Sequence, residues 1–478
     1  MIFEIQAQKK TGEAATFFYD NMTNSLRSST GEVFRDGSRR MGSDYTPFSK
    51  DAPLRKSRNV RVLKIQLGLS CNYSCDYCSQ RFVERAPETS KKHIDAFLAK
   101  LDGLEFSEKD GLKIEFWGGE PLVYWKTLKP LAEAIRAKYK WERPIQFSTI
   151  TNGSLLTKEI CDWLYDMGFF VAMSHDGPGQ HVRGEDPLDN PETRKVILDF
   201  YNRMKPEGRF SFNAMLHNNN HGRKAVHDWF INLTGDTGVI LGEGAIVDAY
   251  DEGGYANMLS TAADHFSFRK TAFNDIYSNE GDIGFRGIVD KVDDFIRGIL
   301  AQQPATQLWQ KCGMDNESVV AVDLMGNVIT CQNTSSVEVA GNGESHLGGT
   351  IDKIEEVAIS TATHWSNREH CSSCPVLHLC KGSCMYLEGK YWDISCRNAY
   401  TDNVALFALA IERITGYIPT LIKADHLPKE RQDIWGGIYE HKDEPVRKVI
   451  PIKMVAEKKI VEGTEVFDVA RPAHADAE

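Results

Sequence analysis

Short apolar runs alternate with amphipathic stretches through the first half of the chain. The apolar runs are rich in β-branched and aromatic residues and lie at 62–68, 113–118, 145–153, 169–177, 209–217 and 239–247. Apolar residues recur at helical spacing between them, at 91–103, 124–140, 157–168, 192–204 and 222–234. Strands alternating with helices are typical of βα units around a parallel sheet. Six units are two fewer than a closed (β/α)8 barrel has, so the pattern predicts an α/β fold with an open, partial (β/α)6 TIM-like barrel.

Residues suited to chemistry follow four of these predicted strands. Cys71, Gly118, Asn152 and Asp176 each lie where a strand is expected to end. In barrels of βα units the active site lies at the carboxyl ends of the strands. We therefore expect one site at that edge of the sheet.

The pattern changes near residue 310. From there to residue 396, long helical patterns are few and seven of the eleven cysteines occur. The segment 323–331 predicts a β-hairpin with Gly326 near its bend, and a helical pattern follows at 398–416. We predict four parts, which are an N-terminal β-rich extension at 1–59, the barrel at 60–305, a small cysteine-rich domain with a β-hairpin and helices at 306–416, and a partly disordered extension at 417–478.

Composition narrows the setting. A chain of 478 residues, 41% hydrophobic and 26% charged, is expected to be soluble and globular with well-buried cores. It has no run of 18 apolar residues and no secretory layout at its start, so we expect a cytoplasmic protein with no membrane partner. Cysteine clusters in a reducing compartment usually indicate metal binding or catalysis. The net charge of −11 argues against a nucleic-acid partner.

The segment LSCNYSCDYCSQ places Cys71, Cys75 and Cys78 within eight residues. A disulfide knot, half of a zinc site, an iron–sulfur cluster and a chance grouping are the alternatives. Each iron of a [4Fe–4S] cube normally takes one thiolate, so three cysteines leave one iron open. A zinc site needs a fourth ligand from elsewhere. The location after the first predicted barrel strand favours the cluster.

In this loop the sequence resembles the radical S-adenosylmethionine (SAM) superfamily, whose defining feature is CxxxCxxC after the first strand. The resemblance implies that Cys71, Cys75 and Cys78 hold a [4Fe–4S] cluster whose open iron is chelated by SAM. The reduced cluster would then cleave SAM to a 5′-deoxyadenosyl radical that abstracts hydrogen from the substrate. It also implies that Tyr77 lies beside the SAM adenine, with loop packing as the alternative role.

Two further segments carry the resemblance. FWGGEP, at 116–121, is similar to the GGE motif that binds the SAM amino group. Gly118 and Gly119 allow a close backbone approach, and Glu120 supplies an anion for an ammonium group. Asn152 and Ser174, at the next two strand ends, are implied to contact the SAM ribose or carboxylate, with plain turn roles as the alternative.

The later cysteines resemble the seven-cysteine pattern of the SPASM domain of peptide-modifying radical SAM enzymes. That resemblance implies two auxiliary [4Fe–4S] clusters and three clusters in all. The first auxiliary set is Cys312, Cys331 and Cys384, and the second is Cys371, Cys374, Cys380 and Cys396. A zinc ribbon could use Cys371, Cys374, Cys380 and Cys384. It would leave Cys312, Cys331 and Cys396 unexplained.

The sequence departs from the sulfatase-maturase pattern, because no additional cysteine lies between Cys312 and Cys331. One iron of the first auxiliary cluster is then open, or is bound by Asp315, Glu317, solvent or substrate. Cys161, outside every motif, is expected to be a small buried hydrophobe.

The resemblance implies an enzyme that oxidatively modifies a side chain of a peptide or protein substrate, with or without a leader segment. A cross-link is the expected product, and a flavodoxin or ferredoxin the expected electron donor. Sulfatase-maturase-like oxidation, peptide epimerisation, small-molecule dehydrogenation and a nonenzymatic iron–sulfur or zinc scaffold are the alternatives. No catalytic residue is assigned. The strands before residue 60 either recognise a leader or cover one end of the barrel.

Overall fold

The computed structural model describes residues 1–40, 42–248, 250, 257–341 and 343–437, and the backbone of 456–461 and 464–469. Its central sheet has the strand order β10-β9-β8-β7-β6-β5-β11-β12-β13. The first six strands in this order are parallel and are β10 (Leu241–Ile246), β9 (Phe210–Leu216), β8 (Phe170–Ser174), β7 (Gln146–Thr151), β6 (Lys113–Trp117) and β5 (Val62–Gln66). These are the six predicted strands in their predicted sequence, which confirms the partial barrel.

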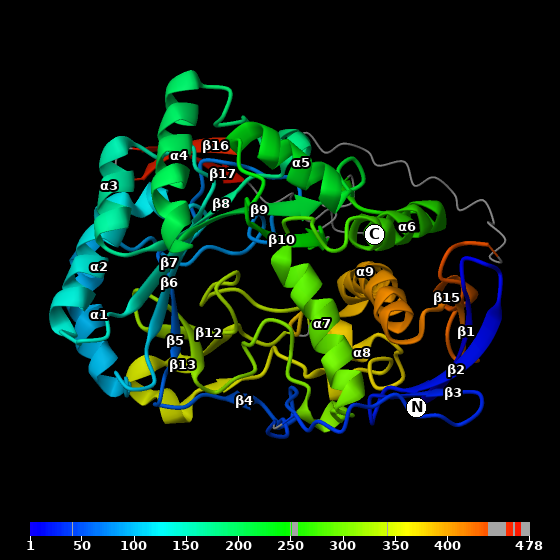
Figure 1. Ribbon diagram of the computed structural model, residues 1–478. Coiled ribbons are helices and arrows are strands. Elements are labelled where there is room, and N and C mark those ends of the chain that lie inside the picture. The colour runs from blue at the N-terminus through cyan, green and yellow to red at the C-terminus, as the bar shows by residue number, and fades with distance from the viewer. Residues whose placement is uncertain are drawn as a thin grey trace, which may run out of the picture.

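Helices between these strands cover the outer face of the sheet (Figure 1). They are α1 (Ile94–Lys100), α2 (Trp125–Lys138), α3 (Lys158–Asp166), α4 (Pro191–Met204) and α5 (Arg223–Thr234). Thr157 is the N-cap of helix α3, because its hydroxyl accepts a hydrogen bond from the backbone N–H of Ile160. Its buried side includes Cys161, which is 5% exposed within the core. The expectation that Cys161 is a buried hydrophobe is confirmed.

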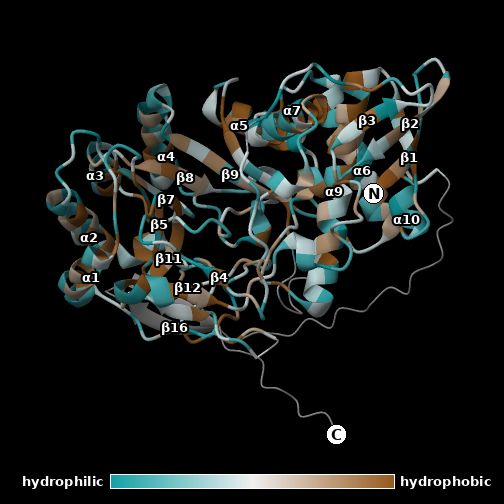
Figure 2. Cartoon of the chain, turned by 90° about the horizontal axis from the view of Figure 1, so that it is seen from below, coloured by the Kyte–Doolittle hydropathy of each residue, from teal (hydrophilic) through white to brown (hydrophobic). Residues whose placement is uncertain are grey.

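Burial alternates along the barrel strands. The outward residues, such as Leu63, Ile65 and Phe116, are fully buried beneath the helices. The inward residues, such as Lys64 and Glu115, are only half-buried and line a cavity. Figure 2 shows the hydrophobic strands between helices whose outer sides are polar. The apolar core therefore lies outside the sheet, and the interior of the barrel is left open for a ligand.

The sheet continues beyond the barrel. β11 (Val319–Asp323) runs parallel to β5 and forms a hairpin with β12 (Asn327–Ile329), which pairs with β13 (Leu347–Thr350). Gly326 lies at the bend with φ +82°, a conformation that favours glycine, so the predicted hairpin is confirmed. The sheet crosses the predicted boundary between residues 305 and 306. The four-part division remains a prediction.

Three longer helices follow the barrel in the described chain, and they are α6 (Ala262–Ser278), α7 (Arg286–Leu300) and α9 (Gly389–Thr415). The short helix α8 (Leu377–Cys380) lies between α7 and α9 in the sequence. The helix predicted at 398–416 begins nine residues earlier, at Gly389, so Cys396 lies inside it. The first two turns of α9 bury only Ser395, so they lack the apolar periodicity that predicts a helix. Among the described residues, no helix is both long and apolar enough to cross a bilayer.

The predicted N-terminal strands are present, and the C-terminal extension completes their sheet. β1 (Ile2–Gln8), β2 (Ala14–Asp20) and β3 (Ser25–Ser28) are antiparallel, and β1 also pairs with β15 (Ile418–Lys423). The Tyr19 ring packs edge-on against Phe295 of α7 and Phe407 of α9. The sheet thus lies against α7 and α9 rather than over one end of the barrel (Figure 1).

Short elements complete the described chain. They are β4 (Leu54–Arg55), β14 (Ala358–Ile359), α10 (Lys429–Gln432), β16 (Ala456–Val461) and β17 (Thr464–Val469). Of the end of the chain expected to be disordered, 469–478, Val469 is the last residue of β17, and residues 470–478 lie outside the described residues.

Candidate active site

Three cysteines lie together in the loop that follows β5. Burial raises the pKa of the Cys75 thiol to about 12, and the nearby Cys78 adds to this. Burial also raises the pKa of Cys71, with Cys75, Glu120 and Cys78 contributing. The three sulfur atoms are therefore electrostatic neighbours. Among the described residues, no three His, Cys, Asp or Glu side chains converge on one ion position.

The glycine-rich segment after β6 lies directly against the cysteine loop. The backbone N–H of Gly119 donates to the carbonyl of Gly68, and that of Glu120 donates to the carbonyl of Ser70. A Cβ atom at Gly119 would lie 2.5 Å from the carbonyl oxygens of Leu69 and Ser70. Only glycine permits this approach. The GGE motif therefore positions the cysteine loop.

Glu120 is 1% exposed and its carboxylate is already hydrogen-bonded. It accepts the backbone N–H groups of Leu122 at 2.9 Å and Asn152 at 2.7 Å, and the Thr151 hydroxyl at 2.7 Å. Burial raises its pKa against these bonds. A carboxylate has about four acceptor positions, so about one is left for the expected ammonium group. Glu120 joins the ends of β6 and β7 as well.

Asn152 also contacts the cysteine loop. Its Nδ2 donates to Oδ1 of Asn72 at 2.9 Å, and Nδ2 of Asn72 donates to Oγ of Ser154 at 2.8 Å. Asn72 lies between Cys71 and Cys75, so the end of β7 holds this loop from the other side. Gly118 follows β6 on the same edge, and the half-buried Ser174 ends β8.

Tyr77 joins a buried network at the end of β8. Its hydroxyl donates to Oδ2 of Asp176 and accepts from Nη1 of Arg183 at 2.7 Å. Asp176 is fully buried and also accepts the backbone N–H of Met215 at 2.9 Å. Arg183 lowers the pKa of Cys75 and so favours its thiolate. Arg183 was not identified from the sequence, because no motif contains it.

The later cysteines influence one another's pKa in two groups, and the binding of a cluster by either group stays a prediction. Burial raises the pKa of Cys384 most, and the nearby thiols of Cys331 and Cys312 raise it further. The thiols that raise the pKa of Cys371 and Cys374 belong to the other set and are Cys380 and Cys396. We call Cys312, Cys331 and Cys384 the first auxiliary group, and Cys371, Cys374, Cys380 and Cys396 the second auxiliary group.

The two carboxylates considered for the open iron differ in burial. Asp315 is 4% exposed and accepts the backbone N–H of Gln310 at 2.8 Å. Burial is the largest cause that raises the pKa of Cys312, and the nearby Asp315 raises it further. Glu317 is exposed. Asp315 is the better placed of the two.

A cavity of about 610 Å³ fills the barrel interior and reaches the first auxiliary group. Glu115 lies in its wall and pairs with Lys113 at 2.7 Å and Lys64 at 3.6 Å, and it accepts Nε1 of Trp117 at 3.0 Å. Burial acts to raise the pKa of Glu115, but these partners hold it below its usual value. Lys64 and Glu115 could have been identified as charges at inward positions of two strands.

Asp248 lies in the same cavity wall, just after β10. Its oxygens accept Nδ2 of Asn398 at 3.1 Å and Oγ of Ser395 at 3.2 Å. Burial raises its pKa, and these bonds act against burial. No sequence motif marks Asp248, so only the folded chain identifies it.

Cysteines in the loop after the first strand of an open barrel, held by a glycine-rich turn that carries Glu120, are the arrangement expected of a radical SAM enzyme. Comparison with known families agrees, because residues 65–228 match the family described as the Radical SAM superfamily. A radical SAM domain implies a [4Fe–4S] cluster and SAM.

The chain is similar to the radical SAM cyclopropyl synthase TigE of Paramaledivibacter caminithermalis, at 23% identity over 76% of this chain and 75% of that one. It is 29% identical to the serine-type anaerobic sulfatase-maturating enzyme of Bacteroides thetaiotaomicron, over 36% of this chain and 40% of that one. Among solved structures, native anSMEcpe with bound AdoMet superposes with a TM-score of 0.54 at 20% identity, over 74% of this chain and 98% of that one. The structural likeness shows the shared fold.

Proposed function

We propose that this enzyme oxidises a side chain of a peptide inside the barrel cavity and forms a carbon–carbon bond. The observation that carries the proposal is the cavity itself. Its wall combines inward residues of the barrel strands with Cys312, Cys331 and Cys384. A substrate in this space would contact the first auxiliary group, which forms part of the wall.

The cysteine sets fit three clusters, held by Cys71, Cys75 and Cys78, by the first auxiliary group and by the second. When bound, the SAM-binding cluster and SAM supply a hydrogen-abstracting radical, and an auxiliary cluster supplies an electron acceptor. Tyr77, Gly118, Gly119, Glu120, Asn152 and Ser174 are the residues proposed to hold SAM. Flavodoxin or ferredoxin is the proposed electron donor. The proposed compartment is a reducing cytoplasm, where clustered cysteines usually bind metal or act in catalysis.

The side chains in the cavity suit an oxidation. Closing a carbon–carbon bond breaks two C–H bonds, so one hydrogen leaves as an atom to the 5′-deoxyadenosyl radical and the other as a proton. The remaining electron leaves to an iron–sulfur acceptor. The Asp248 carboxylate is the proposed proton acceptor, since burial raises its pKa and with it its affinity for a proton. Glu115 stays ionised beside Lys64 and Lys113 and is proposed to orient polar groups of the substrate.

The relatives support the substrate and the product class. TigE is named as a cyclopropyl synthase, and closing a cyclopropane ring within a saturated side chain removes two hydrogens. The anSMEcpe enzyme has been solved with a Cp18Cys peptide. Oxidation as in a sulfatase-maturating enzyme is the second candidate, because 180 residues are 29% identical to one.

The test is anaerobic turnover with SAM and a reductant on peptides encoded beside the gene. We expect 5′-deoxyadenosine and a peptide lighter by about two mass units, with no gain of reactivity toward hydrazides. A hydrazide-reactive product of the same mass would instead show an aldehyde, the sulfatase-maturase outcome. A product of unchanged mass in ordinary water that gains one deuterium in heavy water would show epimerisation. Loss of this deuterium label in Cys161→Ala would identify Cys161 as the hydrogen donor. Absence of 5′-deoxyadenosine would contradict the proposed function altogether.

A further inference from the structure

The C-terminal extension brings a positive charge to the second auxiliary group. Arg431 lies in the short helix α10, and its Nη2 donates to Sγ of Cys396 at 3.5 Å. An arginine guanidinium stays protonated in proteins. A positive charge therefore lies against one cysteine of the second auxiliary group.

Arg431 is held in place by its own surroundings. The Tyr400 hydroxyl donates to the carbonyl of Arg431 at 2.5 Å, and the guanidinium lies over the Tyr400 ring at 5.1 Å. Tyr400 lies in α9, four residues after Cys396. The same helix therefore carries the cysteine and the ring that positions its cationic partner.

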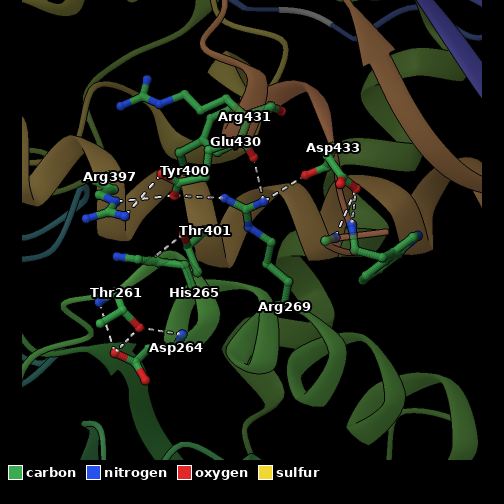
Figure 3. A network of polar contacts seen from close by, with 12 residues as sticks. Thr261, Asp264, His265, Arg269, Arg397, Tyr400, Thr401, Glu430, Arg431 and Asp433 are labelled. Carbon is green, nitrogen blue, oxygen red and sulfur yellow. Dashed lines mark hydrogen bonds and ion pairs between the residues drawn. The ribbon is translucent and has the colours of Figure 1, made fainter. Parts of the chain in front are cut away.

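Two further arginines fix helix α10 (Figure 3). Arg269 of α6 donates through Nη1 to the carbonyls of Glu430 at 3.0 Å and Asp433 at 2.9 Å. Arg397 donates to both carboxylate oxygens of Glu430, at 3.2 Å and 3.0 Å. Arg269 is fully buried, so these bonds are shielded from water. A short helix without such anchors would fray.

Both ends of the described chain also hold the loop that carries Cys371 and Cys374. Nδ2 of Asn21, after β2, donates to the carbonyls of Ser372 at 3.0 Å and Cys374 at 2.9 Å. From the C-terminal extension, Nε2 of His426 hydrogen-bonds the carbonyl of Ser373 at 2.7 Å. The group is thus enclosed by segments that lie outside the cysteine-rich region.

We propose that Arg431 raises the reduction potential of the cluster held by the second auxiliary group, which makes the C-terminal extension part of the redox apparatus. A cluster with four thiolates becomes more negative when it is reduced. A cation that also donates a hydrogen bond to one sulfur stabilises that reduced state more than the oxidised one. An electron leaving the substrate would then be held more readily at the second auxiliary group.

The test is a redox titration followed by EPR on the full chain, reconstituted with iron and sulfide. Arg431→Gln and Arg431→Met remove the charge and should shift one reduction step to more negative potential. Arg431→Lys keeps the charge but loses the planar donor, so its shift should be smaller. Lys429→Gln is the matched control, because it removes the same charge from an exposed position on the same helix. It should leave every step in place.

Wild-type potentials in both neutral variants would overturn the proposal, as would an equal shift in Lys429→Gln. If both neutral variants bind about four irons fewer than the wild type, Arg431 is needed to assemble the cluster and the proposed redox role is wrong. The inference rests on the proposed second auxiliary cluster but not on the peptide chemistry. A chain that binds its clusters and modifies no peptide would contradict the proposed function and leave this inference standing.

Discussion

The carboxylate of Glu120 holds two strand ends together, and it is also the group expected to bind the SAM ammonium. Both roles use the same two carboxylate oxygens, which already accept three hydrogen bonds from protein donors. A substitution there is expected to change the fold locally as well as the affinity for SAM. This separates Glu120 from a residue that touches only the ligand.

In Glu120→Gln, the side-chain NH2 group must face an N–H or O–H group that now donates a hydrogen bond to the carboxylate. Loss of a charge-assisted hydrogen bond costs about 1.5–3 kcal/mol, or roughly 10- to 150-fold in affinity. We therefore expect weaker SAM binding by anaerobic calorimetry together with a lower melting temperature, with all clusters still bound. Glu115→Gln, on the strand before it, is the control and should keep SAM affinity. An unchanged affinity in Glu120→Gln would make the motif a turn only.

Asp248 is the cavity carboxylate proposed to take the second hydrogen as a proton. Asp248→Asn should retain both partners, Asn398 and Ser395, only in part, but it cannot accept a proton. Loss of a general base typically slows a step by about 10²- to 10⁴-fold. We expect 5′-deoxyadenosine to form while product formation falls by that factor, measured by mass spectrometry of the same reaction. Glu243→Gln, in the same cavity wall, should leave both rates unchanged, and equal rates in Asp248→Asn would rule out this role.

At the scale of elements, the N-terminal sheet supports the second auxiliary group through the turn after β2. Asn21 is fully buried, and its carbonyl accepts a hydrogen bond from Nε2 of His378 at 2.8 Å. The turn therefore contacts both the loop with Cys374 and helix α8. This gives the first strands of the chain a role that their sequence does not suggest.

Asn21→Ala leaves the carbonyls of Ser372 and Cys374 without their donor. An unsatisfied buried polar group costs about 1–3 kcal/mol, and here the cost falls on a loop that carries two cysteines. We expect a loss of about four irons per chain on reconstitution, measured by colorimetric iron analysis. Thr23→Ala, exposed in the same turn, should bind the full amount. Full iron in Asn21→Ala would mean that the loop is held without the sheet.

The elements also differ in how far the sequence could predict them. The six barrel strands and the helices between them have strong local periodicity, and they form within a few residues of their expected positions. The pairing of β11 with β5 and of β1 with β15 joins segments far apart in the sequence. No local pattern encodes such long-range pairing, so the extended sheet and the joined chain ends could not be predicted.

For the site, spacing was informative wherever several residues form one motif. Within each cysteine set that the spacing defines, the thiols raise one another's pKa, and the binding of clusters by these sets stays a prediction. Arg183, Asp248 and Arg431 belong to no motif, and each acts through a partner brought near by folding. Single polar residues of this kind are not distinguishable in the sequence from solvent-exposed ones.

For the whole molecule, the cluster count is the decisive prediction. Ten cysteines in three groups should bind about twelve irons when reconstituted without oxygen. Replacing Cys71, Cys75 and Cys78 together by alanine should remove about four irons and all SAM cleavage, measured as 5′-deoxyadenosine. The matched control is Cys161→Ala, which should bind the full amount of iron because Cys161 lies on the buried side of α3, outside the three cysteine groups. SAM cleavage by the triple variant would refute the assignment of this cluster.

The pairing of β1 with β15 has a consequence for how the enzyme is made. Residues 2–8 are synthesised before the barrel, but their partner strand at 418–423 emerges only after it. The barrel strands, between residues 62 and 246, can pair before that. Arg431 and His426 emerge later still, so the second auxiliary group is enclosed last. Arg431 and His426 can therefore enclose the second auxiliary group only after every cysteine of the three groups has been synthesised.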